Sequence, residues 1–130
     1  MANILNIDDN KFDLLIVSKI LEDAGHHVIS VINAKTAREL LQINNIDLII
    51  TDLVMPFSGL SFLLQTRSDY QNLPIIVTSG EVNEVLMSTL VEHGADVMLK
   101  KPLSAEILIK YTENLLNHGR PDKGITDELR

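Results

Sequence analysis

Short apolar runs alternate with segments of helical period along most of the chain. The runs cover residues 4–7, 28–32, 46–51, 75–78 and 97–99, and several of them are apolar at consecutive positions, as in Leu48-Ile49-Ile50. Consecutive apolar residues are typical of strands that are covered on both faces, as in a parallel sheet. The pattern therefore predicts five buried strands that run parallel to one another.

The segments between these runs carry the residues that usually begin and end helices. Asparagine and serine favour the first position of a helix, and glycine favours its end. Five strand-helix units predict an open α/β sheet with helices on both faces, and they are too few for a closed eightfold barrel. The helices are expected from Asn10 to Gly25, after Asn33, from about Gly59 to Ser68, from about Asn83 to His93, and from Ser104 to Gly119.

The length of 130 residues fits one domain with a substantial core. The last residues, from Gly119 onward, have no hydrophobic period and contain glycine and proline. We therefore expect a domain over residues 1–118, followed by a flexible C-terminal tail or the start of a linker over residues 119–130.

Composition and charge exclude several classes of protein. The chain has 11 basic and 18 acidic side chains, a net charge of −7, which argues against direct nucleic-acid binding because that needs a basic face. It has no cysteine, so disulfides and thiolate metal sites are excluded. No apolar run approaches the ~18 residues of a membrane span, and the N-terminus lacks the pattern of a signal peptide. We expect a cytoplasmic protein without a membrane segment.

Chemically reactive side chains follow four of the predicted strands. Asp8 and Asp9 follow the first strand, Asp52 the third, Ser79 the fourth, and Lys100 and Lys101 the fifth. In an open α/β sheet, functional groups gather beyond the carboxyl ends of the strands. The sequence therefore predicts three carboxylates, a hydroxyl and an ammonium group at one edge of the sheet.

This set of groups suits phosphoryl acceptance. Carboxylates at close range repel one another unless one is protonated or a hard cation lies among them, and Mg²⁺ is bound in this way. A carboxylate beside Mg²⁺ is a nucleophile toward phosphorus. The lysine and the hydroxyl would then stabilise the charge on the phosphoryl oxygens. The four histidines (His26, His27, His93 and His118) are expected on the surface near helix ends.

Four motifs occur in order at suitable spacing. They are Ile-Asp-Asp at 7–9, Asp-Leu-Val-Met-Pro at 52–56, Pro-Ile-Ile-Val-Thr-Ser-Gly at 74–80 and Lys-Pro at 101–102. Through them the chain resembles the response-regulator receiver domains of two-component signal transduction, over about residues 3–117. The resemblance implies a flavodoxin-like, doubly wound parallel sheet of five strands in the order 2-1-3-4-5.

The resemblance also implies roles for the residues at the strand ends. Asp52 would accept a phosphoryl group from a histidine kinase or a histidine phosphotransfer protein. Mg²⁺ would be bound by Asp8, Asp9, Asp52 and the backbone carbonyl of Val54.

Two further residues take their roles from the same resemblance. Ser79 would be the switch hydroxyl, and Lys101, which we expect before a cis peptide bond to Pro102, would contact the phosphoryl group. Phosphorylation would change contacts with a downstream effector protein or domain. Members of the family commonly dimerise through the fourth and fifth helices, and the resemblance implies this mode of dimerisation here. The phosphotransfer would be self-directed, without turnover of an external substrate.

Two departures from the family pattern keep other functions open. Gly59 follows Asp52 one residue earlier than is usual, and Met98 stands where the family usually has tyrosine or phenylalanine. Both features would suit a constitutive interaction module that signals without phosphate, which phosphate-independent partner binding would reveal. A Mg²⁺-dependent phosphatase is less consistent with the sequence, because its aspartates usually form Asp-x-Asp and a cap domain encloses its substrate.

Overall fold

The computed structural model describes residues 1–52, 59–81 and 83–121, and within them the strands and helices alternate without exception. The expected strands and helices are present, with ends displaced by at most one or two residues. Their bounds are β1 Asn3–Ile7, α1 Lys11–Asp23, β2 His27–Val31, α2 Ala34–Ile43, β3 Leu48–Asp52, α3 Gly59–Asp69, β4 Ile75–Ser79, α4 Glu84–Glu92, β5 Val97–Lys100 and α5 Ala105–His118.

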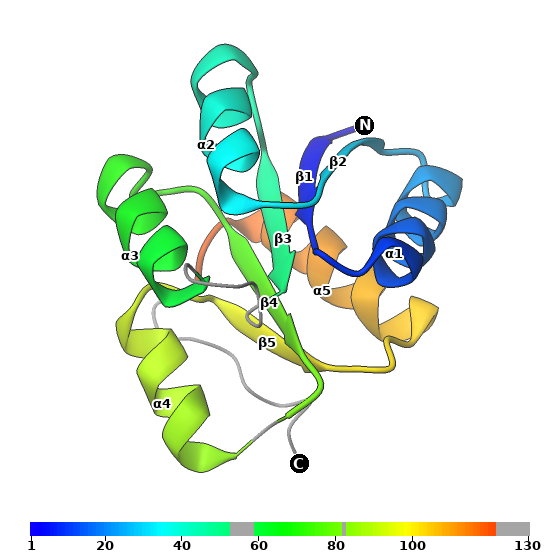
Figure 1. The fold of residues 1–130 in the computed structure, drawn as a ribbon. Coiled ribbons are helices and arrows are strands. Elements are labelled where there is room, and N and C mark those ends of the chain that lie inside the picture. The colour runs from blue at the N-terminus through cyan, green and yellow to red at the C-terminus, as the bar shows by residue number, and fades with distance from the viewer. Residues whose placement is uncertain (53–58, 82, 122–130) are drawn as a thin grey trace.

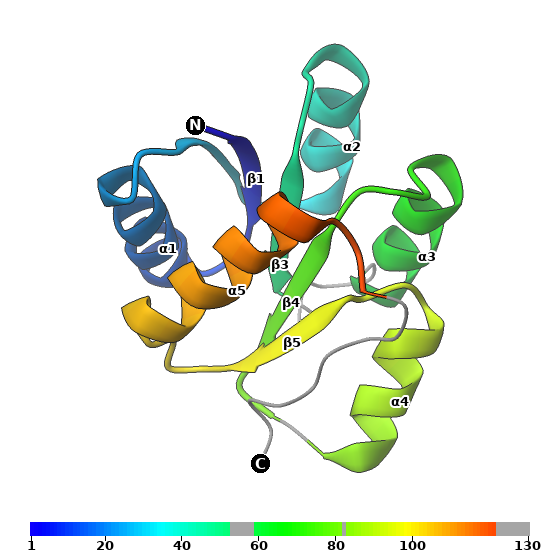
Figure 2. The same ribbon diagram turned by 180° about the vertical axis from the view of Figure 1, so that it is seen from behind.

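The five strands form one parallel sheet in the order β2-β1-β3-β4-β5 (Figure 1). Helices α1 and α5 cover one face of this sheet, and α2, α3 and α4 cover the other (Figure 2). The predicted fold class, strand order and placement of helices on both faces are confirmed.

The apolar runs explain why the sheet is covered on both faces. Every residue of β3 and of β4 is buried. Successive side chains of a strand point to opposite faces, so each strand supplies two separate layers of core. In β3, Ile49 packs with α2 and α3, whereas Leu48 and Ile50 pack with α1 and α5.

The predicted caps fix where the helices begin. The side chain of Asn10 accepts hydrogen bonds from the backbone N–H groups of Phe12 and Asp13, at 2.9 and 3.0 Å. Asn33, Asn83 and Ser104 cap α2, α4 and α5 in the same way. These bonds satisfy N–H groups that have no partner within the helix. The start of α1 is therefore fixed directly after β1, close to the carboxyl edge of the sheet.

A buried ion cluster holds together the opposite, amino-terminal edge of the sheet. Asp96, which is 1% exposed, accepts hydrogen bonds from Arg67 Nη2 at 3.0 Å, Arg120 Nε at 2.8 Å and the backbone N–H of Ile75 at 2.9 Å. Arg67 also donates to the carbonyl of Gly94, whose φ of 110° and close contact with Arg67 leave no room for a Cβ. The cluster thus joins α3, β4, β5 and the residues after α5.

Arg120 belongs to the segment that was expected to be a flexible tail. It is bonded both to Asp96 and to the carbonyl oxygen of Gln71, the latter at 2.9 Å. Residues 122–130 lie outside the described part of the chain. The boundary at residue 118 and the flexibility of the tail therefore stay predictions.

We predict that Asp96→Ala lowers the free energy of unfolding by about 3 kcal/mol or more, because it leaves the Arg67 guanidinium buried without its carboxylate. Urea denaturation checks this value. The matched control is Asp69→Ala at the exposed end of α3, which should change the stability by less than about 0.5 kcal/mol. Equal effects of the two substitutions would contradict a structural role for the cluster.

Candidate functional site

The candidate site lies where three parallel strands end at the carboxyl edge of the sheet. Asp8 follows β1 directly, Asp52 is the last residue of β3, and Lys101 follows β5. Asp8 is 3% exposed and Asp52 is 6% exposed, whereas Asp9 is exposed. The sheet thereby places two buried carboxylates beside a more accessible one.

These three aspartates are close enough to share a cation. One carboxylate oxygen from each of Asp8, Asp9 and Asp52 lies within 4.8 Å of the others. Mg²⁺ prefers oxygen ligands and uses a small number of carboxylates together with water. The donor set therefore fits Mg²⁺. Val54, whose carbonyl was expected to be a further ligand, lies outside the described residues.

Lys101 is the cation that faces this acidic cluster. Its Nζ lies 2.9 Å from Asp8 Oδ2, 3.2 Å from Asp52 Oδ2 and 2.9 Å from Asp13 Oδ2. Its peptide bond to Pro102 is cis, as expected. The ammonium group thus partly neutralises several carboxylates that would otherwise repel one another.

The electrostatics of the site follow from burial and from these contacts. Burial raises the pKa of Asp8, and the charge of Asp52 adds to this effect, although a hydrogen bond from the Asn10 N–H and the contact with Lys101 oppose it. Burial by itself would lower the pKa of Lys101. The hydrogen bonds to Asp13 and Asp8 and the charge of Asp52 outweigh burial, so that pKa is raised. Lys101 therefore stays charged throughout the physiological range.

Ser79 lies at the same edge of the sheet but makes its hydrogen bonds within its own loop. It is the last residue of β4 and is 1% exposed. Its hydroxyl donates to the carbonyl oxygen of Glu81 at 2.8 Å and accepts from the N–H of Glu81 at 3.1 Å. For this hydroxyl to donate elsewhere, it must first leave the carbonyl of Glu81.

Asp13 is the site residue that the strand-end argument missed. It lies in the first turn of α1 rather than at a strand end, and its carboxylate contacts Lys101 as closely as that of Asp8 does. A signal was available in the sequence, because a helix that begins directly after an acidic pair presents its first turn to the same edge. Hydrophobic patterning does not single out such a position.

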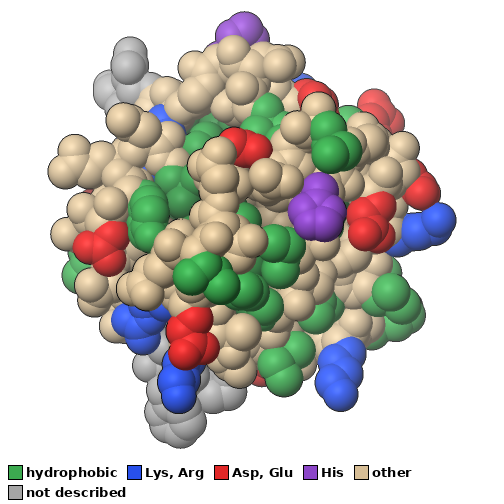
Figure 3. Space-filling view, turned by 90° about the horizontal axis from the view of Figure 1, so that it is seen from above, with side chains coloured by type: hydrophobic (Ala, Val, Ile, Leu, Met, Phe, Trp, Pro, Cys, Tyr) green, Lys and Arg blue, Asp and Glu red, His purple; other side chains and the backbone are tan. Residues whose placement is uncertain are grey.

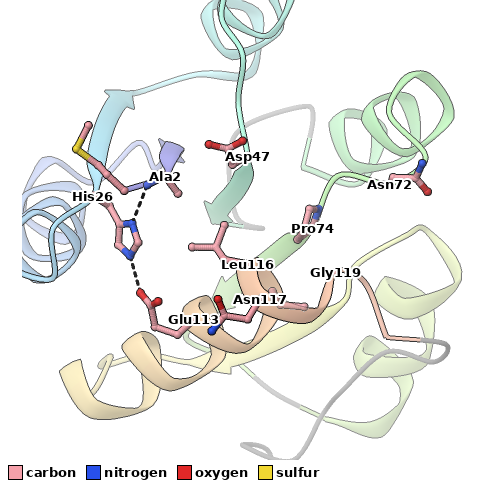
Figure 4. Close-up of a pocket in the computed structure, with 11 residues that line it drawn as sticks. Ala2, His26, Asp47, Asn72, Pro74, Glu113, Leu116, Asn117 and Gly119 are labelled. Carbon is pink, nitrogen blue, oxygen red and sulfur yellow. Dashed lines mark hydrogen bonds and ion pairs between the residues drawn. The ribbon is translucent and has the colours of Figure 1, made fainter.

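A cavity of about 490 Å³ lies at the opposite edge of the sheet, next to Ala2, Asp47 and Pro74 (Figure 4). His26 points between two partners there: its Nδ1 accepts from the N–H of Ala2 at 3.1 Å, and its Nε2 contacts Glu113. The side chain of His26 is only 7% exposed, so the expected surface position is wrong. Both ring nitrogens are engaged, which is typical of a structural histidine.

The face on which the N-terminus lies has mixed chemistry (Figure 3). The acidic and basic side chains visible in this view are scattered, with hydrophobic side chains between them. Within the part of the chain that the structure describes, no helix is long and apolar enough to cross a membrane.

Comparison with known proteins assigns the family. The model of the response regulator receiver domain matches residues 4–113 of the chain. The chain belongs to this family. The matched range contains Asp8, Asp52, Ser79 and Lys101, so the candidate site lies within the residues that match the family model.

The relatives of this receiver include longer regulators. It is 35% identical over 124 residues to two-component response regulator ARR21 of Arabidopsis thaliana, and 32% identical over 134 residues to the DNA-binding transcriptional regulator NtrC of Azospirillum brasilense. These alignments cover 93% and 98% of the chain but only 20% and 28% of the relatives, so the chain spans well under a third of their length.

A solved structure agrees with the receiver along nearly its whole length. The chemotaxis protein CheY4 of Vibrio cholerae has a TM-score of 0.83 and 31% sequence identity, and the match covers 88% of this chain and 98% of that one. The structure therefore describes a receiver domain of a two-component response regulator.

We predict that Lys101→Met lowers the stability of the metal-free receiver by about 2 kcal/mol at pH 7, because it leaves buried carboxylates without their cation. Without Lys101, the pKa of Asp8 rises further above that of the unfolded chain. The folded state then holds a proton that the unfolded state has lost, so stability recovers as the pH falls from 7 toward 5.

Urea denaturation in a chelator at several pH values checks this result. Lys100→Met, which changes the adjacent exposed residue, is the matched control and should leave the stability and its pH dependence nearly unchanged. The same pH dependence in Lys101→Met and Lys100→Met would contradict the electrostatic argument.

Proposed function

We propose that this receiver accepts a phosphoryl group on Asp52 in the presence of Mg²⁺, and that phosphorylation switches its contacts with other proteins. The observation that carries the proposal is the convergence on Asp52: its carboxylate lies 3.2 Å from the ammonium of Lys101, and one of its oxygens lies within 4.8 Å of a carboxylate oxygen of Asp8 and of Asp9. A nucleophile, a cation and a metal-ligand set are the groups that phosphoryl transfer requires.

The chemistry assigned to Asp52 is a nucleophilic displacement at phosphorus. A carboxylate oxygen of Asp52 forms the new P–O bond, while the P–N bond of a phosphohistidine breaks and the imidazole keeps the electron pair. The product is an acyl phosphate. Lys101 neutralises negative charge on the transferred phosphoryl oxygens. Asp8, Asp9, Asp52 and, as the family resemblance implies, the carbonyl of Val54 would hold Mg²⁺, which would supply further positive charge near the phosphoryl oxygens.

Ser79 is proposed to report the modification. Its hydroxyl would exchange the carbonyl of Glu81 for an oxygen of the phosphoryl group, because a charged acceptor forms the stronger hydrogen bond. This movement would bias the surface of α4, β5 and α5 between two states.

The proposed partners are those that the family resemblance implies. The proposed donor is a histidine kinase or a histidine phosphotransfer protein, and the output passes to an effector protein or domain, with dimerisation through α4 and α5 as one mode of response. We propose that this domain makes no direct contact with nucleic acid and acts in the cytoplasm. Its own chemistry would be limited to phosphoryl transfer onto Asp52 and the later hydrolysis of that acyl phosphate, without turnover of an external substrate.

We predict that incubation with phosphoramidate and Mg²⁺ adds a single phosphoryl group to the wild-type receiver and none to Asp52→Asn, because the amide is not a nucleophile toward phosphorus. Intact-mass spectrometry measures the adduct. Asp69→Asn, which makes the same change at an exposed carboxylate of α3, is the control and should be phosphorylated like the wild type.

The result that overturns the proposal is a folded wild-type protein without an adduct. That result would favour the module that signals without phosphate. An adduct that persists in Asp52→Asn would move the acceptor to another residue.

We also predict that the phosphoryl adduct requires Mg²⁺ and disappears when a chelator is present. Asp9→Asn should raise the Mg²⁺ concentration for half-maximal phosphorylation by roughly tenfold, the effect of losing about 1.4 kcal/mol of metal binding. The Mg²⁺ dependence of the initial rate provides the measurement. An unchanged Mg²⁺ requirement in Asp9→Asn would remove Asp9 from the metal site.

A further inference from the structure

We propose that Asp13 is a positioning residue that holds the ammonium group of Lys101 beside Asp52 while metal and phosphoryl group bind. This inference rests on the proposed function and adds to it a residue outside the set at the strand ends. Its basis is the 2.9 Å contact between Asp13 Oδ2 and Lys101 Nζ, which is as short as the contact with Asp8.

The three acceptors of Lys101 differ in what else they are needed for. An ammonium group has three N–H donors, and here they face Asp8, Asp13 and Asp52. Asp8 and Asp52 also belong, with Asp9, to the set of three aspartates whose carboxylates fit a metal ion, whereas Asp13 does not belong to this set. A cation bound to Asp8 and Asp52 would weaken their attraction for the ammonium group. Asp13 is then the acceptor that keeps Lys101 in place.

The local structure leaves the carboxylate of Asp13 available for this role. At its position in the first turn of α1, an acidic side chain commonly bonds back to the N–H of the capping residue. Here the N–H of the cap, Asn10, instead donates to Asp8 Oδ1 at 2.9 Å. The N–H of Asp13 is bonded to Asn10 Oδ1 at 3.0 Å, so its backbone is held while its side chain reaches Lys101.

The described surroundings of Lys101 offer few other hydrogen-bond acceptors to its ammonium group. A small hollow of about 130 Å³ beside the contact has mostly apolar walls, formed by Phe12, Ile16, Pro102 and Leu103. Apolar walls offer no acceptor to an ammonium group. The side chain of Lys101 is 19% exposed and that of Asp13 is 32% exposed, so water screens the pair only in part. Without Asp13, the ammonium group on this side is left to solvent.

Positioning and simple charge predict opposite effects of removing Asp13. If Asp13 acted only as one more negative charge, its loss would reduce repulsion of an anionic phosphodonor and speed phosphorylation. If Asp13 positions Lys101, its loss slows the reaction, and the slowing disappears when Lys101 itself is absent. An amide at this position keeps an oxygen acceptor and would therefore retain part of the rate.

The test compares initial rates of phosphoryl uptake from phosphoramidate at saturating Mg²⁺ in wild type, Asp13→Ala and Asp13→Asn. We expect Asp13→Ala to be slower by about tenfold, the size of one lost charge-assisted hydrogen bond, with Asp13→Asn between it and wild type. In a Lys101→Ala background, Asp13→Ala should cause no further loss. Asp23→Ala, on the exposed part of α1 beside Lys19, is the matched control and should keep the wild-type rate.

Three kinetic results would overturn the inference: an unchanged or faster rate in Asp13→Ala, equal rates in Asp13→Ala and Asp13→Asn, or an undiminished effect of Asp13→Ala when Lys101 is absent. Each can arise only in a wild-type protein that takes up phosphate, so each leaves the proposed function standing. A wild type without phosphoryl uptake refutes the proposed function, and the role of Asp13 in phosphorylation falls with it.

A second measurement tests the contact without phosphorylation. Brief acetylation of the metal-free protein, followed by peptide mass spectrometry, compares Lys101 with its exposed neighbour Lys100. We expect Lys101 to be labelled several times faster in Asp13→Ala than in wild type, with Lys100 unchanged. Equal labelling of Lys101 in the two proteins would show that Asp13 does not hold it, and would overturn the inference directly.

Discussion

The receiver is organised around one electrostatic constraint, the burial of carboxylates beside the ammonium group of Lys101. Asp8 and Asp52 lie far apart in the sequence from Lys101, and only the parallel arrangement of β1, β3 and β5 brings all three to one edge. Two buried negative charges at this distance are tolerated because Lys101 contacts both. The apolar strands that exclude water from the core thus also create the low-dielectric setting in which a phosphoryl group would meet strong local charges.

The apolar runs and the residues at their ends predicted a parallel sheet with helices on both faces and the carboxylates at its carboxyl edge, whereas the strand order and the choice of Lys101 rather than Lys100 came from the family resemblance. A strand ends where its apolar run ends, and parallel strands end at the same edge, so the meeting of Asp8, Asp9 and Asp52 follows from the positions of the apolar runs in the sequence. Patterning could not give the direction of individual side chains. The bonds of Ser79 within its own loop and the reach of Asp13 depend on rotamers and helix caps, and these are decided only when the elements pack. The roles of these residues in phosphorylation stay predictions.

Burial was hardest to anticipate for polar residues with distant partners. His26 follows a helix and resembles a surface residue in the sequence, yet it links the N–H of Ala2 to Glu113 on α5. Met98 gives the reverse case: it was singled out for replacing an aromatic residue, and it lies in the same core layer as Leu90 of α4, 2% exposed. A buried methionine has no hydroxyl to present at the surface, and here it fills space in that core layer.

The anchoring of Arg120 has a consequence for access to the molecule. Asp96 precedes β5, at the amino-terminal edge of the sheet, whereas Asp52 ends β3 at the carboxyl edge. The bond from Arg120 to Asp96 therefore draws the chain after α5 toward the pole remote from the acidic cluster. The described residues after α5, up to Pro121, are thus held at the edge of the sheet opposite the one at which a phosphoryl donor is proposed to meet Asp52.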